Sequence, residues 1–232
     1  MRQTVRDYFH ATFDRYEQLF EVLTCDEAYY RKPITLRHPL IFYFGHTATF
    51  FINKLLLAGL ITERINPAFD AMCSVGVDEM SWDDLSEAHY AWPAVSELRA
   101  YRDAVRARVD AVIANAPLTL PIDWHNPWWA ILMGIEHERI HLETSSVLIR
   151  QHALAFVQPH AAWPPCRETG AAPANALVAV AAGAVALGKA RSDARYGWDN
   201  EYGTRHAEVA PFQASRYIVS NQEFLAFVEA GG

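Results

Sequence analysis

Cysteine is scarce in this chain, and its distribution offers no framework for a disulfide-stabilised fold. The three cysteines, Cys25, Cys73 and Cys166, lie far apart in the sequence and form no C-x-x-C pair. Such usage is typical of a reducing compartment, so we expect a cytoplasmic protein.

The sequence also lacks the motifs and the charge of several common function classes. It contains no G-x-x-x-x-G-K-[ST] loop, no dinucleotide-binding glycine fingerprint and no G-x-S-x-G motif. Acidic residues outnumber basic ones by 27 to 20, whereas nucleic-acid binders normally carry a basic surface. Neither a nucleotide nor a nucleic-acid partner is therefore indicated.

No segment predicts a membrane partner. The N-terminal residues Met1–Asp7 lack the apolar core of a signal peptide. The stretch Pro39–Ile61 is mostly apolar, but it contains His46, Asn53 and Lys54, and its charge-free part is shorter than the roughly 18–20 residues of a span. We expect this stretch to be a buried helix of a bundle.

Hydrophobic residues make up 51% of the 232-residue chain, enough for one domain with a sizeable core and a remainder. Their spacing predicts four long helices: Thr4–Leu23, His38–Leu60, Ala94–Ala116 and Asn126–Leu154. The last begins with Asn126-Pro127, a capping residue followed by a proline suited to the first turn. Because a long connection joins the second and third helices, the pattern predicts a four-helix bundle over residues 1–158.

The composition changes after the bundle. Residues 159–175 are rich in proline and alanine and predict a linker. In residues 176–232 we expect a short hairpin of Leu177–Val180 with Ala184–Leu187, a strand over Ala207–Tyr217 and a helix over Ser220–Ala230, with Ser220 and Glu223 forming a capping box. These elements are too few for an independent core, so they predict the opening of a larger domain.

The strongest local signal is His137-Glu138-Arg139-Ile140-His141. Histidines at i and i+4 differ by only about 40° around a helix axis, so both rings can reach one metal ion. The segment also reads as H-E-x-x-H, in which the glutamate of zinc peptidases acts as general base. The spacing alone fits metal ligation and an ordinary histidine pair equally well.

The neighbouring residues favour the metal. Ala130, Met133 and Ser145 share a helix face with the histidines, which predicts that the pair points into the bundle. Gly134, one turn earlier, is expected to leave open space beside the metal. Two imidazoles buried without partners would be costly, and a metal removes that cost.

A third ligand must come from another helix. Glu143 is predicted to lie more than about 100° from the histidine pair, and Glu136 and Glu138 also lie off that face, as hydrogen-bond partners or solvated charges. His46, in the middle of an apolar helix, is the natural candidate, although a hydrogen-bonded core histidine is the alternative. Three neutral imidazoles with open positions would suit Fe(II), Zn(II), Ni(II) or Cu(II).

The remaining candidates are weaker. Exposed positions are expected for four histidines: His10, His38, His89 and His125. Three arginines share one helix face, either solvated or binding a carboxylate: Arg99, Arg102 and Arg106. Three tryptophans precede the histidine helix and are expected to pack the end of the bundle or to line a substrate pocket: Trp124, Trp128 and Trp129.

Two segments of the chain, Leu36–Ala48 and Trp129–Ser145, resemble the ovothiol-pathway 5-histidylcysteine sulfoxide synthases and, less closely, their ergothioneine-pathway relatives. They carry the G-H-T and H-x-x-x-H-x-E motifs of the family's iron site. The tail is similar to the start of the family's second domain, in three segments: Gly188-Lys189, Tyr196–Glu201 and Val219–Phe224.

The resemblance implies a mainly α protein: a DinB-like four-helix bundle, then the truncated start of an α+β formylglycine-generating-enzyme (sulfatase-modifying-factor)-like domain. It implies that His46, His137 and His141 ligate Fe(II), and that L-cysteine, L-histidine and O2 are the substrates of a C–S bond-forming oxidoreductase. The family draws an active-site tyrosine and much of its pocket from a part beyond this sequence. We therefore expect the 232-residue chain to hold iron but to turn over poorly.

Three alternatives remain open. A zinc metallopeptidase of the metzincin type would need glycine and histidine where Thr144 and Val147 stand. A DinB-type metal-dependent thiol S-transferase would share the bundle and the histidines but would not need the second domain. A non-catalytic bundle is the third. The sequence does not choose between histidine and a methylated histidine as acceptor.

Overall fold

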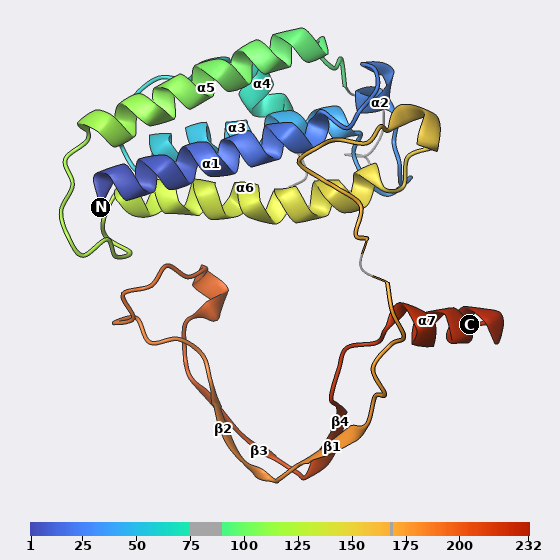
Figure 1. Ribbon diagram of the computed structural model, residues 1–232. Coiled ribbons are helices and arrows are strands. Elements are labelled where there is room, and N and C mark those ends of the chain that lie inside the picture. Colours follow the sequence, from blue (N-terminus) through green and yellow to red (C-terminus); the bar gives the residue numbers. More distant parts are fainter. Residues whose placement is uncertain (75–89, 168) are drawn as a thin grey trace. The chain divides into compact units, whose positions relative to one another are not determined.

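The computed structural model describes residues 1–74, 90–167 and 169–232 (Figure 1). Contacts divide the chain into two compact units, Met1–Pro164 and Pro165–Gly232. The first unit is helical and the second contains the strands, which confirms the predicted mainly α domain followed by a small α+β part.

Four long helices build the first unit, and each overlaps the segment predicted for it. They are α1 (Arg2–Phe20), α3 (Leu40–Leu57), α5 (Val95–Asn115) and α6 (Trp128–Ile149). Short helices that the apolar spacing did not predict lie in the connections: α2 (Glu27–Tyr30), α4 (Pro67–Met72) and the 3₁₀ turn η3 (Leu154–Phe156).

The long helices form a closed ring of neighbours. Helix α3 packs against α5 and α6, and α1 packs against the same two helices (Figure 1). Helices α5 and α6 therefore face each other diagonally across the core. Aromatic rings of α1 fill much of that core, and Phe9 meets Phe51 of α3 edge to face at 5.4 Å.

Helix α3 is the apolar central helix that the sequence predicts. By length and composition alone it could cross a membrane, but 67% of it is buried inside the bundle. The burial extends round the helix, because α4, α5 and α6 all pack on it. Its apolar character is thus explained by its place among other helices.

The start of α6 is held by the residues that the sequence singled out. Asn126 Oδ1 accepts a hydrogen bond from Trp128 N at 3.0 Å, but the helix begins one residue later than predicted, with Pro127 in the cap position. Trp128 is fully buried, and its Nε1 donates to Pro117 O at 2.8 Å. Trp124 and Trp129 stack with ring centroids 5.4 Å apart. The prediction that these tryptophans pack the bundle end is confirmed for Trp128.

In the second unit the predicted hairpin is wrong. Strand β1 (Leu177–Val180) pairs antiparallel with β4 (Phe212–Ser215), and β2 (Gly183–Leu187) pairs with β3 (Arg205–Val209). A hairpin between β1 and β2 would place Ala181 and Ala182 in a two-residue turn whose favoured types need positive φ, which alanine disfavours. The chain instead continues through both alanines, and each strand finds a distant partner.

The predicted strand over Ala207–Tyr217 is two strands, β3 and β4, interrupted at Ala210 and Pro211. Proline has no backbone N–H to donate to the ladder, which is consistent with a break at this point.

Helix α7 (Asn221–Glu229) has the predicted capping box. Ser220 Oγ accepts from Glu223 N at 3.2 Å, and Glu223 Oε2 accepts from Ser220 N at 2.8 Å. The helix buries none of its side chains within the described residues, and apolar side chains such as Phe224 and Phe227 are exposed. That residues 176–232 open a formylglycine-generating-enzyme-like domain, after a linker at 159–175, stays a prediction.

Candidate metal centre

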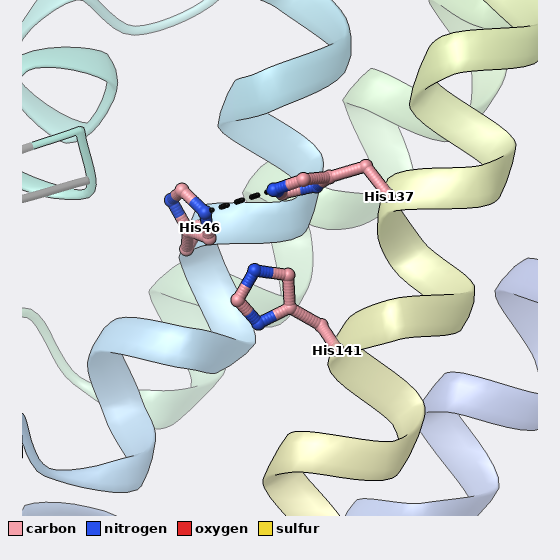
Figure 2. Close-up of side chains that lie close together, drawn as sticks. All are labelled: His46, His137 and His141. Carbon is pink, nitrogen blue, oxygen red and sulfur yellow. Dashed lines mark hydrogen bonds between the residues drawn. The ribbon is translucent and has the colours of Figure 1, made fainter. Parts of the chain in front are cut away.

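Three histidine rings from two helices face one another inside the bundle (Figure 2). His46 comes from α3, and His137 and His141 come from α6, one turn apart. One ring nitrogen from each residue lies within 4.8 Å of the others, and His46 Nε2 is 3.2 Å from His137 Nε2. Two imidazole nitrogens bound to one ion at about 2.1 Å lie roughly 3–3.5 Å apart, so the spacing of His46 and His137 fits a shared metal, and His141 is near enough to join them after a small shift of its side chain.

The orientation of His46 is fixed by a backbone carbonyl. His46 Nδ1 is 2.8 Å from Cys73 O, just after α4. Because a carbonyl only accepts, Nδ1 carries the hydrogen and donates it, which leaves the lone pair of Nε2 facing the other two rings. Such a partner for the non-ligating nitrogen is typical of metal-binding histidines.

Burial keeps the other two rings neutral. The pKa of His137 lies well below its usual range because the ring is desolvated and because His141 and His46 lie nearby. Burial, with a smaller contribution from His46, lowers the pKa of His141 to about 3. The neutral form is the one that binds metal ions. Phe50 stacks on the His137 ring at 3.6 Å, and His137 Nδ1 has no hydrogen-bond partner in the described part of the chain.

Gly45 allows Cys73 to approach α3 closely. A Cβ atom at Gly45 would lie 2.5 Å from Cys73 Sγ and 3.1 Å from Leu98 Cδ1. Because Cys73 O accepts the hydrogen bond that orients His46, the small size of Gly45 helps to position the imidazole.

Replacing Gly45 by alanine is therefore expected to displace Cys73 and to weaken metal binding about 10- to 100-fold, the usual effect of losing a ligand's hydrogen-bond partner. Titration with Co(II), followed by its visible absorption, measures the affinity. Gly170→Ala is the matched control, because nothing lies within 4 Å of a Cβ atom there. An unchanged affinity in Gly45→Ala would show that the close approach does not serve the histidine.

Residues next to the ligands join a buried ion pair. Arg102 of α5 and Glu138 of α6 are both fully buried, and Arg102 Nη2 donates to Glu138 Oε1 at 3.0 Å. Arg102 Nη1 donates to Phe44 O at 2.8 Å and to Thr47 Oγ1 at 2.9 Å, and its Nε donates to Glu17 at 3.1 Å. Of the two alternatives for Arg102, the solvated position is therefore wrong and the bond to a carboxylate is observed; Glu138 is a hydrogen-bond partner and not a solvated charge.

Burial and the partner's charge have opposite effects on the pKa of each member of the pair. Desolvation would lower the pKa of Arg102, but Glu138 and Glu17 outweigh it and raise that pKa. Burial raises the pKa of Glu138, and the charge and hydrogen bond of Arg102 oppose that rise. Because a guanidinium stays protonated in proteins, the positive charge of Arg102 favours the ionised form of Glu138 and opposes the effect of burial.

Comparison with known proteins places the bundle in a family. Residues 8–145 match the family model described as the DinB superfamily. The chain belongs to the DinB superfamily. It is also 28% identical over 239 residues to Ergothioneine biosynthesis protein 1 of Neurospora crassa, an alignment that covers 96% of this chain and 27% of that protein. The chain thus spans about a quarter of the length of this relative.

Other acidic side chains of this DinB bundle lie away from the histidine cluster. Glu136 accepts a hydrogen bond from Tyr8 OH at 2.8 Å, and Glu143 is exposed. Glu138 is engaged by Arg102 and Thr47, so the glutamate of the H-E-x-x-H segment does not take the place of a metallopeptidase base.

The predicted exposure of the remaining histidines is confirmed at some positions and wrong at others. The prediction of an exposed ring is wrong for His38, which is buried and stacks on Phe42 at 4.2 Å. His10 is half-buried and pairs with Asp110 at 2.7 Å, and His125 is exposed as expected. His89 lies outside the described residues.

Two further expectations concern space and charge near the site. The open space expected beside Gly134 is absent, because a Cβ atom there would lie 2.3 Å from the Phe51 ring. Arg99 donates to Tyr29 OH at 2.7 Å and Arg106 pairs with Asp14 at 2.6 Å, so both bind groups of the bundle itself.

Sequence reasoning missed Cys73, Phe50 and the role of Arg102. For Arg102 a signal existed: it follows Leu98 by four residues and precedes Val105 by three, which puts it on the apolar stripe of its helix. A backbone carbonyl such as that of Cys73 leaves no mark in the sequence.

Proposed function

We propose that this DinB bundle carries the iron centre of an O2-dependent sulfoxide synthase. The reaction joins the sulfur of L-cysteine to the imidazole ring of L-histidine and gives 5-histidylcysteine sulfoxide, as in ovothiol biosynthesis. The observation that carries the proposal is the meeting of His46, His137 and His141 at one point. The alignment of nearly the whole chain with Ergothioneine biosynthesis protein 1 supports a C–S bond-forming class of reaction.

The donor set suits such chemistry. Three neutral imidazoles add no negative charge, so an ion held by them remains dipositive and has room for further ligands. Fe(II), when bound, supplies the electron transfer and O2 chemistry of the reaction. One O2 balances the coupling: one oxygen atom enters the sulfoxide, and the other leaves as water with the hydrogens of the thiol and of the ring carbon.

The chain's own residues orient the ligands and shield them from water. Phe42 stacks on His46 with ring centroids 5.2 Å apart, and Phe50 stacks on His137. These rings keep the imidazoles in one orientation and give the centre apolar walls. Substrates held side by side in such a site react faster because their encounter no longer costs entropy.

Anaerobic reconstitution with Fe(II) tests the proposal. We expect one iron per chain and a change in the absorption of the iron–nitric oxide adduct when L-cysteine is added, as for a thiolate that joins the centre. No iron binding, or iron binding without any response to L-cysteine, would contradict the proposal. A thiol S-transferase would respond to the thiol but would consume no O2, so even the slow O2 consumption expected of this chain with L-cysteine and L-histidine separates the two activities.

The acceptor is tested on the same sample. We expect L-histidine to perturb the spectrum of the iron- and cysteine-loaded chain at lower concentration than Nα-trimethylated histidine does. The reverse order would assign the chain to the ergothioneine type of reaction instead of the ovothiol type.

A further inference from the structure

A buried polar network lies directly behind the two helices that carry the histidines. Arg102 reaches from α5 across the core and bonds both ligand helices, at Phe44 O and Thr47 on α3 and at Glu138 on α6. Thr47 Oγ1 in turn donates to Glu138 Oε1 at 3.2 Å. On α1 the Nε of Arg102 donates to Glu17 at 3.1 Å, so the guanidinium joins α5 to three other helices.

The place of the network in the sequence links it to the metal ligands. Thr47 follows His46, and Glu138 follows His137. Neighbouring residues on a helix point about 100° apart, so each helix turns one side chain to the ring cluster and the next to Arg102. A slide or rotation of α3 against α6 that separates His46 from His137 must also break the contacts of Thr47 and Glu138.

The network is also held rigidly. The Arg102 guanidinium lies over the rings of Phe13 at 4.3 Å and Phe44 at 4.7 Å, and its side chain is fully buried. Buried ion pairs contribute little net stability compared with apolar residues of similar size, because both charges lose their hydration. The role that suits such a pair best is to fix the positions of the helices that it joins.

We propose that Arg102, Thr47 and Glu138 form a clamp that sets the register of α3 against α6 and thereby positions His46 and His137 for metal binding. The three are positioning residues and do not touch the metal. The inference rests on the proposed function only in requiring that the three histidines bind a metal ion, whichever ion that is.

Two conservative variants test the clamp with Co(II) as the probe. Thr47→Val keeps the shape and removes the hydroxyl, and Glu138→Gln keeps the shape and removes the charge. We expect both to bind Co(II) about 10- to 100-fold more weakly than the wild-type chain, with an altered visible absorption spectrum. If Glu138→Gln does not fold, Thr47→Val carries the test alone.

Two controls lower stability without touching the clamp. Asp110→Asn breaks the pair with Arg6, which joins α1 and α5 and involves neither ligand helix. Ile113→Val thins the core on the same helix as Arg102, roughly 16 Å along it. Both are expected to melt at lower temperature and to bind Co(II) with wild-type affinity and spectrum.

A double variant separates the effect on the position of the metal ligands from the effect on the stability of the fold. Arg102→Met/Glu138→Met removes both charges of the fully buried pair and leaves only the partly exposed carboxylate of Glu17 without its partner, so we expect its melting temperature to recover relative to Glu138→Gln while its Co(II) affinity stays low. Wild-type affinity and spectrum in Thr47→Val and Glu138→Gln, or recovery of both stability and affinity in the double variant, would overturn the clamp. Absence of Co(II) binding in the wild-type chain would instead contradict the proposed function.

Discussion

Replacing His141 by alanine is expected to weaken metal binding by roughly 10²- to 10³-fold. Zinc sites with four protein ligands are worth about 10–16 kcal/mol in all, so one ligand accounts for roughly 3–4 kcal/mol, and each 1.4 kcal/mol is a factor of ten. His141 is the least buried of the three rings, so its loss disturbs the core least. The measurements are Co(II) and Fe(II) titration and the metal content of the purified chain.

His125→Ala is the matched control for this variant. It removes an exposed histidine that lies outside the ring cluster, so we expect wild-type metal content. If His141→Ala retained the metal at wild-type affinity, the site would not depend on the three rings, and the proposed function would lose its main support.

In the metal-free chain, loss of His141 should also change how the free energy of unfolding depends on pH. With a pKa of about 3 in the folded chain and an ordinary value of 6.5, this ring takes up a proton on unfolding between those pH values. Wild-type stability therefore falls as the pH drops from 6.5 towards 3. In His141→Ala, one proton fewer is taken up on unfolding in this pH range. The free energy of unfolding, measured with denaturant in the presence of a chelator, should therefore fall less steeply with decreasing pH than in the wild-type chain.

The bundle and its histidines were largely predictable because their signals are local. Apolar residues three and four apart define α1, α3, α5 and α6, and the spacing of His137 and His141 places both on one face of α6. His46 was a candidate third partner because an imidazole in so apolar a helix needs a partner, but the sequence left a hydrogen-bonded core histidine open as the alternative.

Features that depend on a distant partner were not predictable. Arg102 lies on an apolar stripe, but nothing near it shows that Glu138 lies across the core. The pairing of β1 with β4 joins residues that are far apart in the chain, whereas the closeness of the two apolar runs in the sequence favoured a hairpin with β2. In both cases the deciding contact is long-range. Both partners are visible in the sequence, but their pairing is not.

Gly134 illustrates the same limit, since a glycine within a helix predicts either open space or a close contact. The structure shows the contact: a Cβ atom would lie 2.3 Å from two atoms of the Phe51 ring, which is fully buried and packs edge to face on Phe9. The ring cannot swing aside without displacing α1. Gly134 thus allows Phe51 of α3 to pack closely on α6, one turn before His137.

Gly134→Ala is accordingly expected to destabilise the chain by about 2 kcal/mol. Alanine gains about 1 kcal/mol of helix propensity over glycine, but overpacking a core costs about 1–3 kcal/mol and more where nothing can yield. Spreading α3 from α6 also separates His46 from His137, so the affinity for Co(II) should fall with the stability. Urea unfolding and Co(II) titration measure the two effects.

The double variant Gly134→Ala/Phe51→Leu identifies the cause. Phe51→Leu alone removes the ring and leaves a cavity, which is expected to cost about 1–2 kcal/mol. In the double variant the alanine methyl occupies part of that cavity, so the two losses should not add, with a favourable coupling of about 1 kcal/mol or more. Stabilisation by Gly134→Ala, or strict additivity of the two substitutions, would mean that Phe51 does not confine position 134. The spacing of the two ligand helices would then be set elsewhere, at the clamp of Arg102, Thr47 and Glu138.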